Sequence, residues 1–368
     1  MEVVFPKFVI SNKSILSEFR FNNLFLLMRY LSSLLLALFF VLSACSNQKE
    51  QDKTVDSSGE SKLKAGLVFD VGGRGDKSFN DSAYNGMELA REEHGIDFVF
   101  VEPQGEGADR EALLRQMAMD PDIDLVIGVG LLFSEDITAL AGEFPDKKFV
   151  CIDYVQKPGV VIPDNLSGIV FDEKKGSFLA GAIAGLTTKT NTVGFIGGMQ
   201  SGIIKKFESG FIDGVKYVNP GATVISGYIG MTGSAFANPV KGKELAIGQY
   251  ARGADIIYQA AGASGLGVID AARETKKLVI CTDRDQEPEA PGFVLTSMIK
   301  SVDKALLKTV ENVLDGSFKG GSLTVFGLDE RYTDYVYNDK NSSLVGAGVH
   351  ERVEGIRKQL LNGEIVLK

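Results

Sequence analysis

Asp124-Leu-Val-Ile-Gly-Val-Gly130 is followed by a helical segment and then by Lys147-Lys-Phe-Val-Cys-Ile-Asp153. About 130 residues later the same order returns, as Asp255-Ile-Ile-Tyr-Gln-Ala-Ala-Gly262, a helical segment and Lys276-Lys-Leu-Val-Ile-Cys-Thr-Asp283. The identity between the two copies is weak, but order and strand length agree, so they predict two similarly built lobes. Ligands of open α/β sheets bind outside the carboxyl ends of strands, so two such lobes facing each other would form a binding cleft.

Apolar, β-branched runs alternate with amphipathic helical stretches along the chain from Leu63 onward. This alternation predicts parallel α/β architecture, and the near-continuous apolar strands predict sheets buried on both faces. We expect two three-layer lobes, with the chain crossing between them near residues 165–175, 285–295 and 325–335. The predicted lobes are residues 63–170 with 290–327, and residues 171–289 with 328–368, and short strands are expected at 293–296 and 336–337.

The composition is that of a soluble globular protein, with 44% hydrophobic and 24% charged residues in a chain of 368. This length favours two domains. A net charge of -9 without a basic stripe argues against a nucleic-acid partner. Cys151 and Cys281 lie in apolar runs assigned to different lobes, so we expect buried free thiols, and no cysteine or histidine spacing indicates a metal.

The N-terminal region carries an export signal. Leu31–Leu42 is an apolar core too short for a comfortable membrane span, which takes about 20 residues, but of the right length for a signal peptide. It runs directly into Leu42-Ser-Ala-Cys45, which resembles a bacterial lipobox and predicts lipidation of Cys45. A cleaved soluble protein and a retained anchor helix are the alternatives. We assign 1–44 to the signal region, with Met28 as a better start.

The polar residues that follow Cys45 show no apolar periodicity. This composition predicts a disordered tether over 45–62. The protein is therefore expected on the cell membrane, held by lipid and facing the periplasm or the exterior.

The loop from Asp70 to Asp81 links the first strand to the first helix. It matches neither the Walker A nor the Rossmann glycine spacing. Asn80 or Asp81 could cap the helix. Phe79 is either a hydrophobic staple or a platform for a ligand ring. Asp70 ends the strand and could face the cleft.

Gly233-Ser-Ala-Phe-Ala-Asn-Pro239 repeats this arrangement in the second lobe. Pro239 suits the first turn of a helix and Asn238 its cap. Phe236 again precedes the cap. One ring from each lobe could enclose a flat heterocycle, and stacking on an aromatic contributes about 1–3 kcal/mol per base.

Carboxylates end several predicted strands, namely Asp153, Asp283 and Asp285. A carboxylate can accept two hydrogen bonds from a vicinal diol such as that of ribose, and Asp153 could instead accept from a base. Each could equally be a helix cap or a solvated charge. Lys300 is either a surface lysine or a donor to a sugar hydroxyl.

Catalytic constellations are absent from the sequence. His94 and His350 are the only two histidines and stand in polar surroundings near predicted helix ends. Serine-hydrolase and zinc-protease motifs are missing too. We expect a binding protein without a cofactor rather than an enzyme.

Several of these segments together resemble the basic membrane protein family, also called PnrA-like after a purine nucleoside receptor. Its members are lipoproteins with the type I periplasmic binding protein fold that serve ABC importers. The resemblance spans about residues 63–368. It is carried by the lipobox, Lys64-Ala-Gly-Leu-Val-Phe-Asp70, Asp76-Lys-Ser-Phe-Asn80, Val193-Gly-Phe-Ile-Gly-Gly-Met199, Phe207-Glu-Ser-Gly-Phe-Ile-Asp-Gly214, Ala260-Ala-Gly-Ala-Ser-Gly-Leu-Gly267 and Asp283-Arg-Asp-Gln286.

The resemblance implies a set of ligand contacts. Phe79 and Phe236 would be the two rings around the base. Asn80 and Asp153 would read the base edge. The ribose would be held by Gly262, Asp283 and Lys300, with Asp285 competing with Asp283 and Asp70 as a further candidate.

The implied function is capture of a purine nucleoside of the guanosine, inosine or adenosine class for an ABC permease. Closure of two lobes around the ligand would supply the mechanism. Three alternatives stay open at this point: a sugar-binding protein on the same fold, a nucleoside-processing enzyme, and a surface adhesin or sensor.

Overall fold

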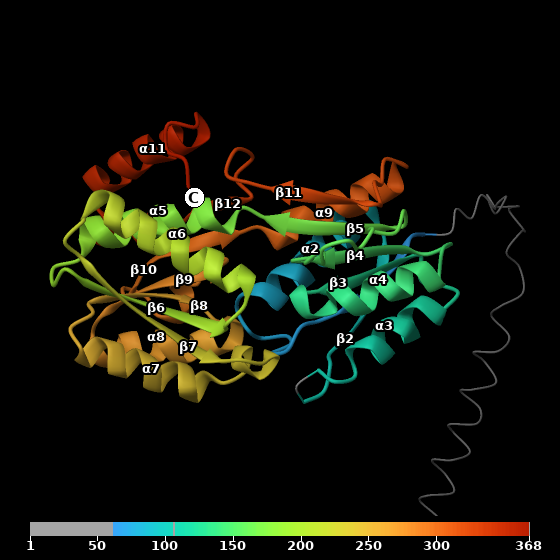
Figure 1. Ribbon diagram of the computed structural model, residues 1–368, viewed down its shortest axis with the longest axis horizontal. Helices are drawn as coiled ribbons and strands as arrows, with labels where there is room; N and C mark the ends of the chain where they lie inside the picture. The colour runs from blue at the N-terminus through green and yellow to red at the C-terminus, as the bar shows by residue number, and fades with distance from the viewer. Residues whose placement is uncertain (1–61, 106, 368) are drawn as a thin grey trace, which may run out of the picture. The chain divides into compact units, whose positions relative to one another are not determined.

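Two six-stranded sheets organise residues 62–105 and 107–367, the part of the chain that the computed structural model describes (Figure 1). The signal region, Cys45 and nearly all of the tether lie outside these residues. The strands of the first sheet, in spatial order, are β11 (Ser322–Phe326), β5 (Leu166–Phe171), β4 (Lys148–Ile152), β3 (Leu125–Val129), β1 (Lys64–Val68) and β2 (Asp97–Val101). Those of the second are β12 (Thr333–Tyr335), β10 (Val294–Lys300), β9 (Leu278–Asp283), β8 (Ile256–Ala260), β6 (Thr192–Met199) and β7 (Thr223–Gly230).

The two sheets share one strand order, as the sequence repeat predicts. Strands β4 and β3 lie side by side in the first sheet, and β9 and β8 take the same places in the second. Every strand pair is parallel except β10 with β12, which is antiparallel. The central strands are buried along their length, which is why they read as unbroken apolar runs.

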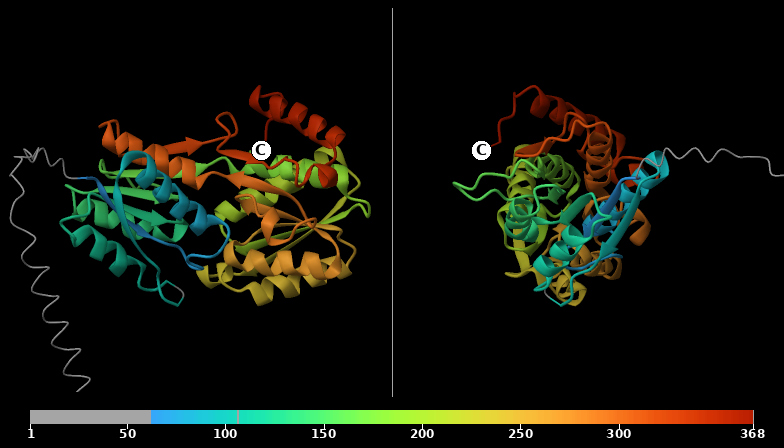
Figure 2. Two further views of the ribbon diagram at one scale, coloured as in Figure 1. Left: turned by 180° about the vertical axis from the view of Figure 1, so that it is seen from behind. Right: turned by 90° about the vertical axis from the view of Figure 1, so that its right-hand side faces the viewer.

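Helices cover both faces of each sheet, so each lobe has three layers (Figures 1 and 2). In the first lobe, α2 and α9 pack on one face and α3 and α4 on the other. In the second, α5, α6 and α11 pack on one face and α7 and α8 on the other. The helices are α2 (Phe79–His94), α3 (Arg110–Met119), α4 (Ser134–Glu143), α5 (Glu173–Thr187), α6 (Gly202–Val218), α7 (Pro239–Ala251), α8 (Gly265–Thr275), α9 (Val302–Leu314), α10 (Ser342–Val345) and α11 (Ala347–Leu361), and the short 3-10 turns are η1 (Leu131–Phe133), η2 (Gly233–Phe236), η3 (Gly262–Ser264) and η4 (Glu287–Glu289).

The chain passes between the sheets three times: between β5 and α5, between β10 and α9, and between β11 and β12. The second passage falls at Ser301, so the predicted boundary at residue 290 is wrong. Strand β10 pairs in parallel with β9 as far as Ile299 opposite Asp283, which fixes it in the second sheet. Its seven residues continue four beyond the predicted strand at 293–296.

The predicted strand at 336–337 lies after the observed one, since β12 spans Thr333–Tyr335. The sequence did not indicate this strand, because it contains Asp334 and a buried aspartate is unusual in a β-strand. Arg331 and Arg357 pair with its carboxylate and compensate the burial.

Two smaller features complete the fold. Cys151 in β4 and Cys281 in β9 are buried free thiols in different sheets, as predicted. None of the helices among the described residues is long and apolar enough to span a membrane.

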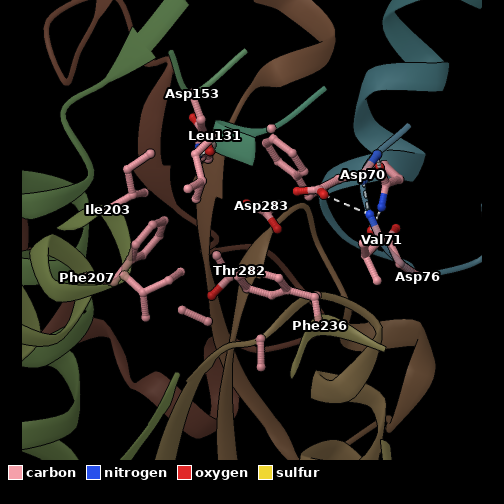
Figure 3. Close-up of a pocket in the computed structure, with 18 residues that line it drawn as sticks. Asp70, Val71, Asp76, Leu131, Asp153, Ile203, Phe207, Phe236, Thr282 and Asp283 are labelled. Carbon is pink, nitrogen blue, oxygen red and sulfur yellow. Dashed lines mark hydrogen bonds and ion pairs between the residues drawn. The ribbon is translucent and has the colours of Figure 1, made fainter. Parts of the chain in front are cut away.

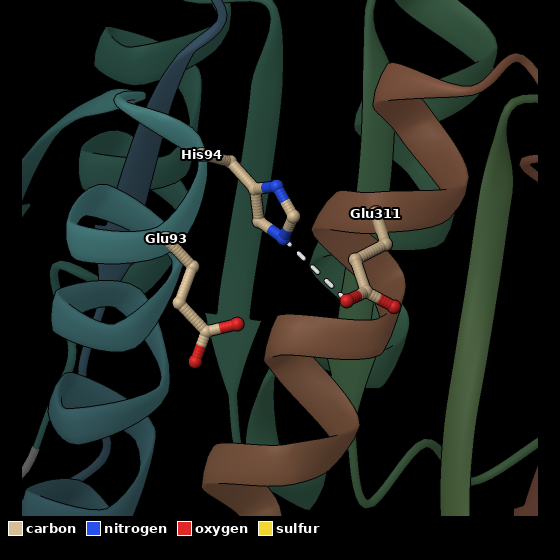
Figure 4. A group of neighbouring side chains, drawn as sticks. All are labelled: Glu93, His94 and Glu311. Carbon is tan, nitrogen blue, oxygen red and sulfur yellow. Dashed lines mark ion pairs between the residues drawn. The ribbon is translucent and has the colours of Figure 1, made fainter.

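Helices α2 and α9 are linked at the surface by a charged group (Figure 4). His94 Nε2 lies 3.4 Å from Glu311 Oε1, with Glu93 beside them. The ligand atoms of the three residues lie within 4.8 Å of one another, a spacing that could admit a cation. All three side chains stay open to water, and an acidic surface group is common without an ion, so we assign it only the linking role.

Candidate ligand-binding cleft

The carboxyl ends of the strands of both sheets converge on one cavity (Figure 3). The cavity holds about 550 Å³ of empty space when its open mouth is included. Eight of the nine predicted ligand contacts line it: Asp70, Phe79, Asn80, Asp153, Phe236, Gly262, Asp283 and Lys300.

Asp285 is the ninth, and it does not line the cavity. Its carboxylate accepts hydrogen bonds from the Glu287 amide at 3.0 Å and from Asn338 Nδ2 at 3.3 Å. Of the two competing carboxylates, Asp283 lines the cavity and Asp285 does not.

Asp153 and Asp283 take equivalent positions at the ends of β4 and β9. Both adopt the left-handed backbone region, with φ of 58° and 74°. Non-glycine residues occupy this region at a cost, and aspartate is among the few that tolerate it. The shared conformation turns both carboxylates toward the cavity at the point where each strand ends.

The two predicted rings stand on opposite lobes. Phe79 is the first residue of α2, and Phe236 is the last residue of η2, directly before α7. The Phe236 ring lies against Gly198, where an added Cβ would come within 2.4 Å of two ring carbons. The predicted cap of α7 is confirmed, since Asn238 Oδ1 accepts from the Lys241 amide and Pro239 begins the helix.

The cap predicted for α2 differs from the structure. The helix begins at Phe79, and neither Asn80 nor Asp81 caps it. Asp76 does so instead, because its carboxylate accepts from the backbone N–H groups of Ser78, Asn80 and Asp81. An aspartate outside the helix thereby satisfies the orphan donors of the first turn.

Asn80 is held by its neighbours within the same loop. Its Oδ1 accepts from the Asp70 amide at 2.9 Å, and its Nδ2 donates to Asp76 at 3.2 Å. The second Nδ2 proton and the second Oδ1 lone pair remain for a ligand. Asn80 thus fixes the loop and still faces the cavity.

Lys300 is buried, with 2% of its surface exposed, so it is not a surface lysine. Its Nζ donates to Asp153 Oδ2 at 2.6 Å and lies 3.6 Å from Glu173 Oε1. Three rings also approach the ammonium, at 5.0 to 5.5 Å from their centres, which is cation–π distance. They belong to Phe79, Phe171 and Phe207.

Burial raises the pKa of two carboxyl groups that line the cavity. It raises the pKa of Asp70 to about 7, although the Val71 amide and Arg110 oppose the rise. It likewise raises the pKa of Asp283 to about 7, against the opposing effect of Lys300. Asp153 Oδ1 is buried and has no hydrogen-bond partner among the described residues, so it is available to a donor on a ligand.

Other lining residues were missed by the sequence analysis, among them Asp76, Phe207 and Leu131. Phe207 lies in helix α6. Phenylalanine is common on the core-facing side of a helix, so the residue type alone did not indicate that Phe207 lines a cavity. Asp76 lies within the quoted loop, and its spacing to Asn80 was the available clue.

Two α/β lobes that bring charged and aromatic side chains at their strand ends to one cavity are the architecture of a solute-binding protein. The chain matches the family model described as ABC transporter substrate-binding protein PnrA-like over residues 63–368. It therefore belongs to this family, Bmp, whose members are solute-binding proteins and not enzymes. The fold is of the type I periplasmic binding protein class.

Comparisons with individual proteins support the family assignment. The chain is 34% identical over 322 residues to basic membrane protein A of Borreliella afzelii, covering 84% of this chain and 94% of that one. It is 30% identical over 362 residues to the ABC transporter nucleoside-binding protein BmpA of Lactococcus lactis subsp. cremoris, covering 91% and 97%. The crystal structure of an ABC transporter solute-binding protein from Aeropyrum pernix K1 superposes with a TM-score of 0.75 at 26% identity, covering 83% and 93%.

Proposed function

We propose that this substrate-binding protein captures purine nucleosides and presents them to an ABC permease, while a lipid on Cys45 holds it at the membrane. The observation that carries the proposal is the pair of phenylalanines, Phe79 and Phe236, brought to one cavity by different lobes. A planar base between them would stack on both rings. The relative from L. lactis, which is named as nucleoside-binding, supports the same ligand class.

The polar groups suit the two ends of a nucleoside. Asp153 Oδ1 has no partner and would accept from a ring N–H or an amino group, and Asn80 retains one donor and one acceptor for the base. Asp283 and Lys300 would bind the ribose diol, with Gly262 providing close backbone approach at φ 55°. Asp70 is a further contact at the wall of the cavity.

The ligand would act by increasing the population of the closed form. An open form exposes two half-sites, and the nucleoside contacts both only when the lobes close, so it favours closure by its differential affinity. The permease would then recognise the closed form.

The test is calorimetric titration of the full-length protein, purified in mild detergent, with guanosine, inosine and adenosine, and separately with ribose. We expect the nucleosides to bind and ribose not to compete with them. Equal binding of free ribose would identify a sugar-binding protein instead. Mass spectrometry of the recovered ligand should show an intact nucleoside, whereas released base would indicate an enzyme.

A further inference from the structure

Glu173 is a buried carboxylate that does not line the cavity. It is the first residue of α5, and 1% of its surface is exposed. A carboxylate in the first turn suits the positive end of a helix, but Asp172 already caps this helix by accepting from the Lys175 amide. Burying a charge is costly unless it is paired, so the burial of Glu173 needs a further explanation.

The partner of Glu173 inside the protein is Lys300. Glu173 Oε1 lies 3.6 Å from Lys300 Nζ, and its Oε2 lies 3.5 Å from Nζ of Lys206, which is half exposed. Lys300 therefore stands between two carboxylates, Asp153 from the first lobe and Glu173 from the start of α5. The Lys300 ammonium is thus held by both carboxylates at once.

The geometry points to Glu173 as the positioning residue for Lys300, holding its ammonium where it can meet both the nucleoside sugar and Asp153. This inference rests on the proposed function. With the charge of Glu173 removed, the ammonium would settle on Asp153 alone, and its hydrogen-bonding capacity toward a ligand would fall. Glu173 would thus act on the ligand through Lys300, without touching it.

The location of the pair adds to its importance. Glu173 immediately follows the first passage of the chain between the sheets, and Lys300 immediately precedes the second. The ion pair thus joins two of the segments about which the lobes would move. A movement of Lys300 toward a ligand would therefore act directly on these connecting segments.

Several charges face the Lys300 ammonium from the surrounding elements. They are Asp153 after β4, Glu173 on α5 and Asp283 at the end of β9, with Lys206 of α6 behind Glu173. Burial lowers the pKa of Lys300, but the three carboxylates outweigh burial and raise it above its ordinary value. Burial also raises the pKa of Glu173, and Lys300 and Lys206 oppose this rise.

The experiment compares the inosine affinity of the full-length wild-type protein with that of Glu173→Gln and Glu173→Asp, by calorimetry from about pH 7 to about pH 11, past the ordinary pKa of a lysine. Glutamine keeps the shape and removes the charge, whereas aspartate keeps the charge one methylene further away. Lys206→Gln is the matched control, since it removes the other partner of Glu173 at the surface. Circular dichroism melting verifies that each variant is folded.

We expect Glu173→Gln to bind inosine about tenfold more weakly near neutral pH, in the range of couplings between contacting charges. Its alkaline loss of affinity should begin about one pH unit lower than in the wild type, because an opposite charge was removed from beside the lysine. Inosine ionises identically in both titrations, so the affinity ratio reports on the protein. Glu173→Asp should recover most of the affinity. Lys206→Gln should stay within about twofold of wild type, because Lys206 is half exposed and water screens its charge.

A wild-type affinity and an unchanged pH profile in folded Glu173→Gln would overturn the positioning role and leave the proposed function standing. A loss of affinity in Glu173→Gln that is the same at every pH would also overturn it, since a merely structural role predicts that result. If the wild-type protein binds none of the nucleosides, the proposed function fails, and this inference fails with it.

Discussion

Lys300 Nζ donates to Asp153 Oδ2 at 2.6 Å, although the two residues stand at the ends of strands in different sheets. A second polar contact joins the lobes nearby, from Ser78 Oγ to Asp283 Oδ2. The protein's own side chains therefore bridge the two lobes. A ligand that enters the cleft adds to these bridges, and the balance between open and closed forms depends on both.

The Lys300–Asp153 bridge can be tested with a double-mutant cycle. Lys300→Met leaves the buried Asp153 carboxylate without its ammonium, whereas Asp153→Asn leaves Lys300 with Glu173 and Asp283 as its remaining carboxylates. Breaking a buried pair costs about 3–5 kcal/mol of stability. We expect each variant to have a lower free energy of unfolding, and to bind inosine about tenfold more weakly or worse because a contact with the ligand is also lost. The double variant should lose much less affinity than the product of the two, as measured by calorimetry. Strictly additive losses would show that the two residues bind the ligand independently.

Removing the ring of Phe236 should weaken nucleoside binding about tenfold or more, since stacking on one aromatic contributes about 1–3 kcal/mol. Calorimetry of Phe236→Ala with guanosine or inosine measures the effect. Phe100→Ala is the control, because Phe100 is an exposed ring on edge strand β2, away from the cavity. Unchanged affinity in Phe236→Ala would count against the sandwich of two rings.

Gly198 supports the Phe236 ring, and this contact gives a test that leaves the phenylalanine in place. A Cβ at Gly198 would lie 2.4 Å from Cδ1 and Cε1 of that ring, so Gly198→Ala must displace it. We expect Gly198→Ala to weaken inosine binding about as much as Phe236→Ala. The matched control is Gly248→Ala, where an added Cβ meets nothing within 4 Å. A Gly198→Ala protein with wild-type affinity would mean that the ring position is unimportant for binding.

The sequence repeat was sufficient to predict the two lobes and the cleft between them. Asp153 and Asp283 hold equivalent places because each ends the second strand of its copy, and strand order alone predicts that they face one cavity. Apolar periodicity is a strong signal for such buried central strands. Apolar periodicity does not indicate which sheet a strand joins, and for this reason the predicted boundary at residue 290 places β10 in the wrong lobe.

The side-chain details of the site were harder to predict. The sequence offered Asn80 and Asp81 as caps of α2, but loop geometry gave that role to Asp76. Phe207 and Glu173 sit in helices, where an aromatic and a first-turn acid are ordinary. Their link to Lys300 depends on the packing of segments far apart in the chain, which local patterns do not encode.

Asp76 organises the half-site that carries Phe79, so its removal should affect both stability and binding. Asp76→Ala leaves three backbone N–H groups without their acceptor, each at a cost of about 1–3 kcal/mol if it stays buried. We expect a lower free energy of unfolding in urea and weaker inosine binding. Asp76→Asn keeps one acceptor oxygen and should fall between Asp76→Ala and the wild type. Equal stability of all three proteins would contradict the capping role.

Acidification should stabilise the ligand-free protein, because burial raises the pKa of Asp70 and of Asp283 to about 7 in the folded chain, against 3.8 for an ordinary aspartate. The folded form thus holds protons that the unfolded form releases. The contribution of these two protonated carboxyls to the free energy of unfolding is fully present below the ordinary aspartate pKa, and it is lost as the pH rises through about 7. We expect the melting temperature to rise from about pH 8 to about pH 5. Asp70→Asn keeps the acceptor for the Val71 amide but cannot ionise, so its melting temperature should vary less. Asp122→Asn, at an exposed aspartate, is the control, and its melting temperature should vary with pH as in the wild type. If the melting temperature of Asp70→Asn varies with pH as much as that of the wild type, Asp70 is already charged in the folded protein.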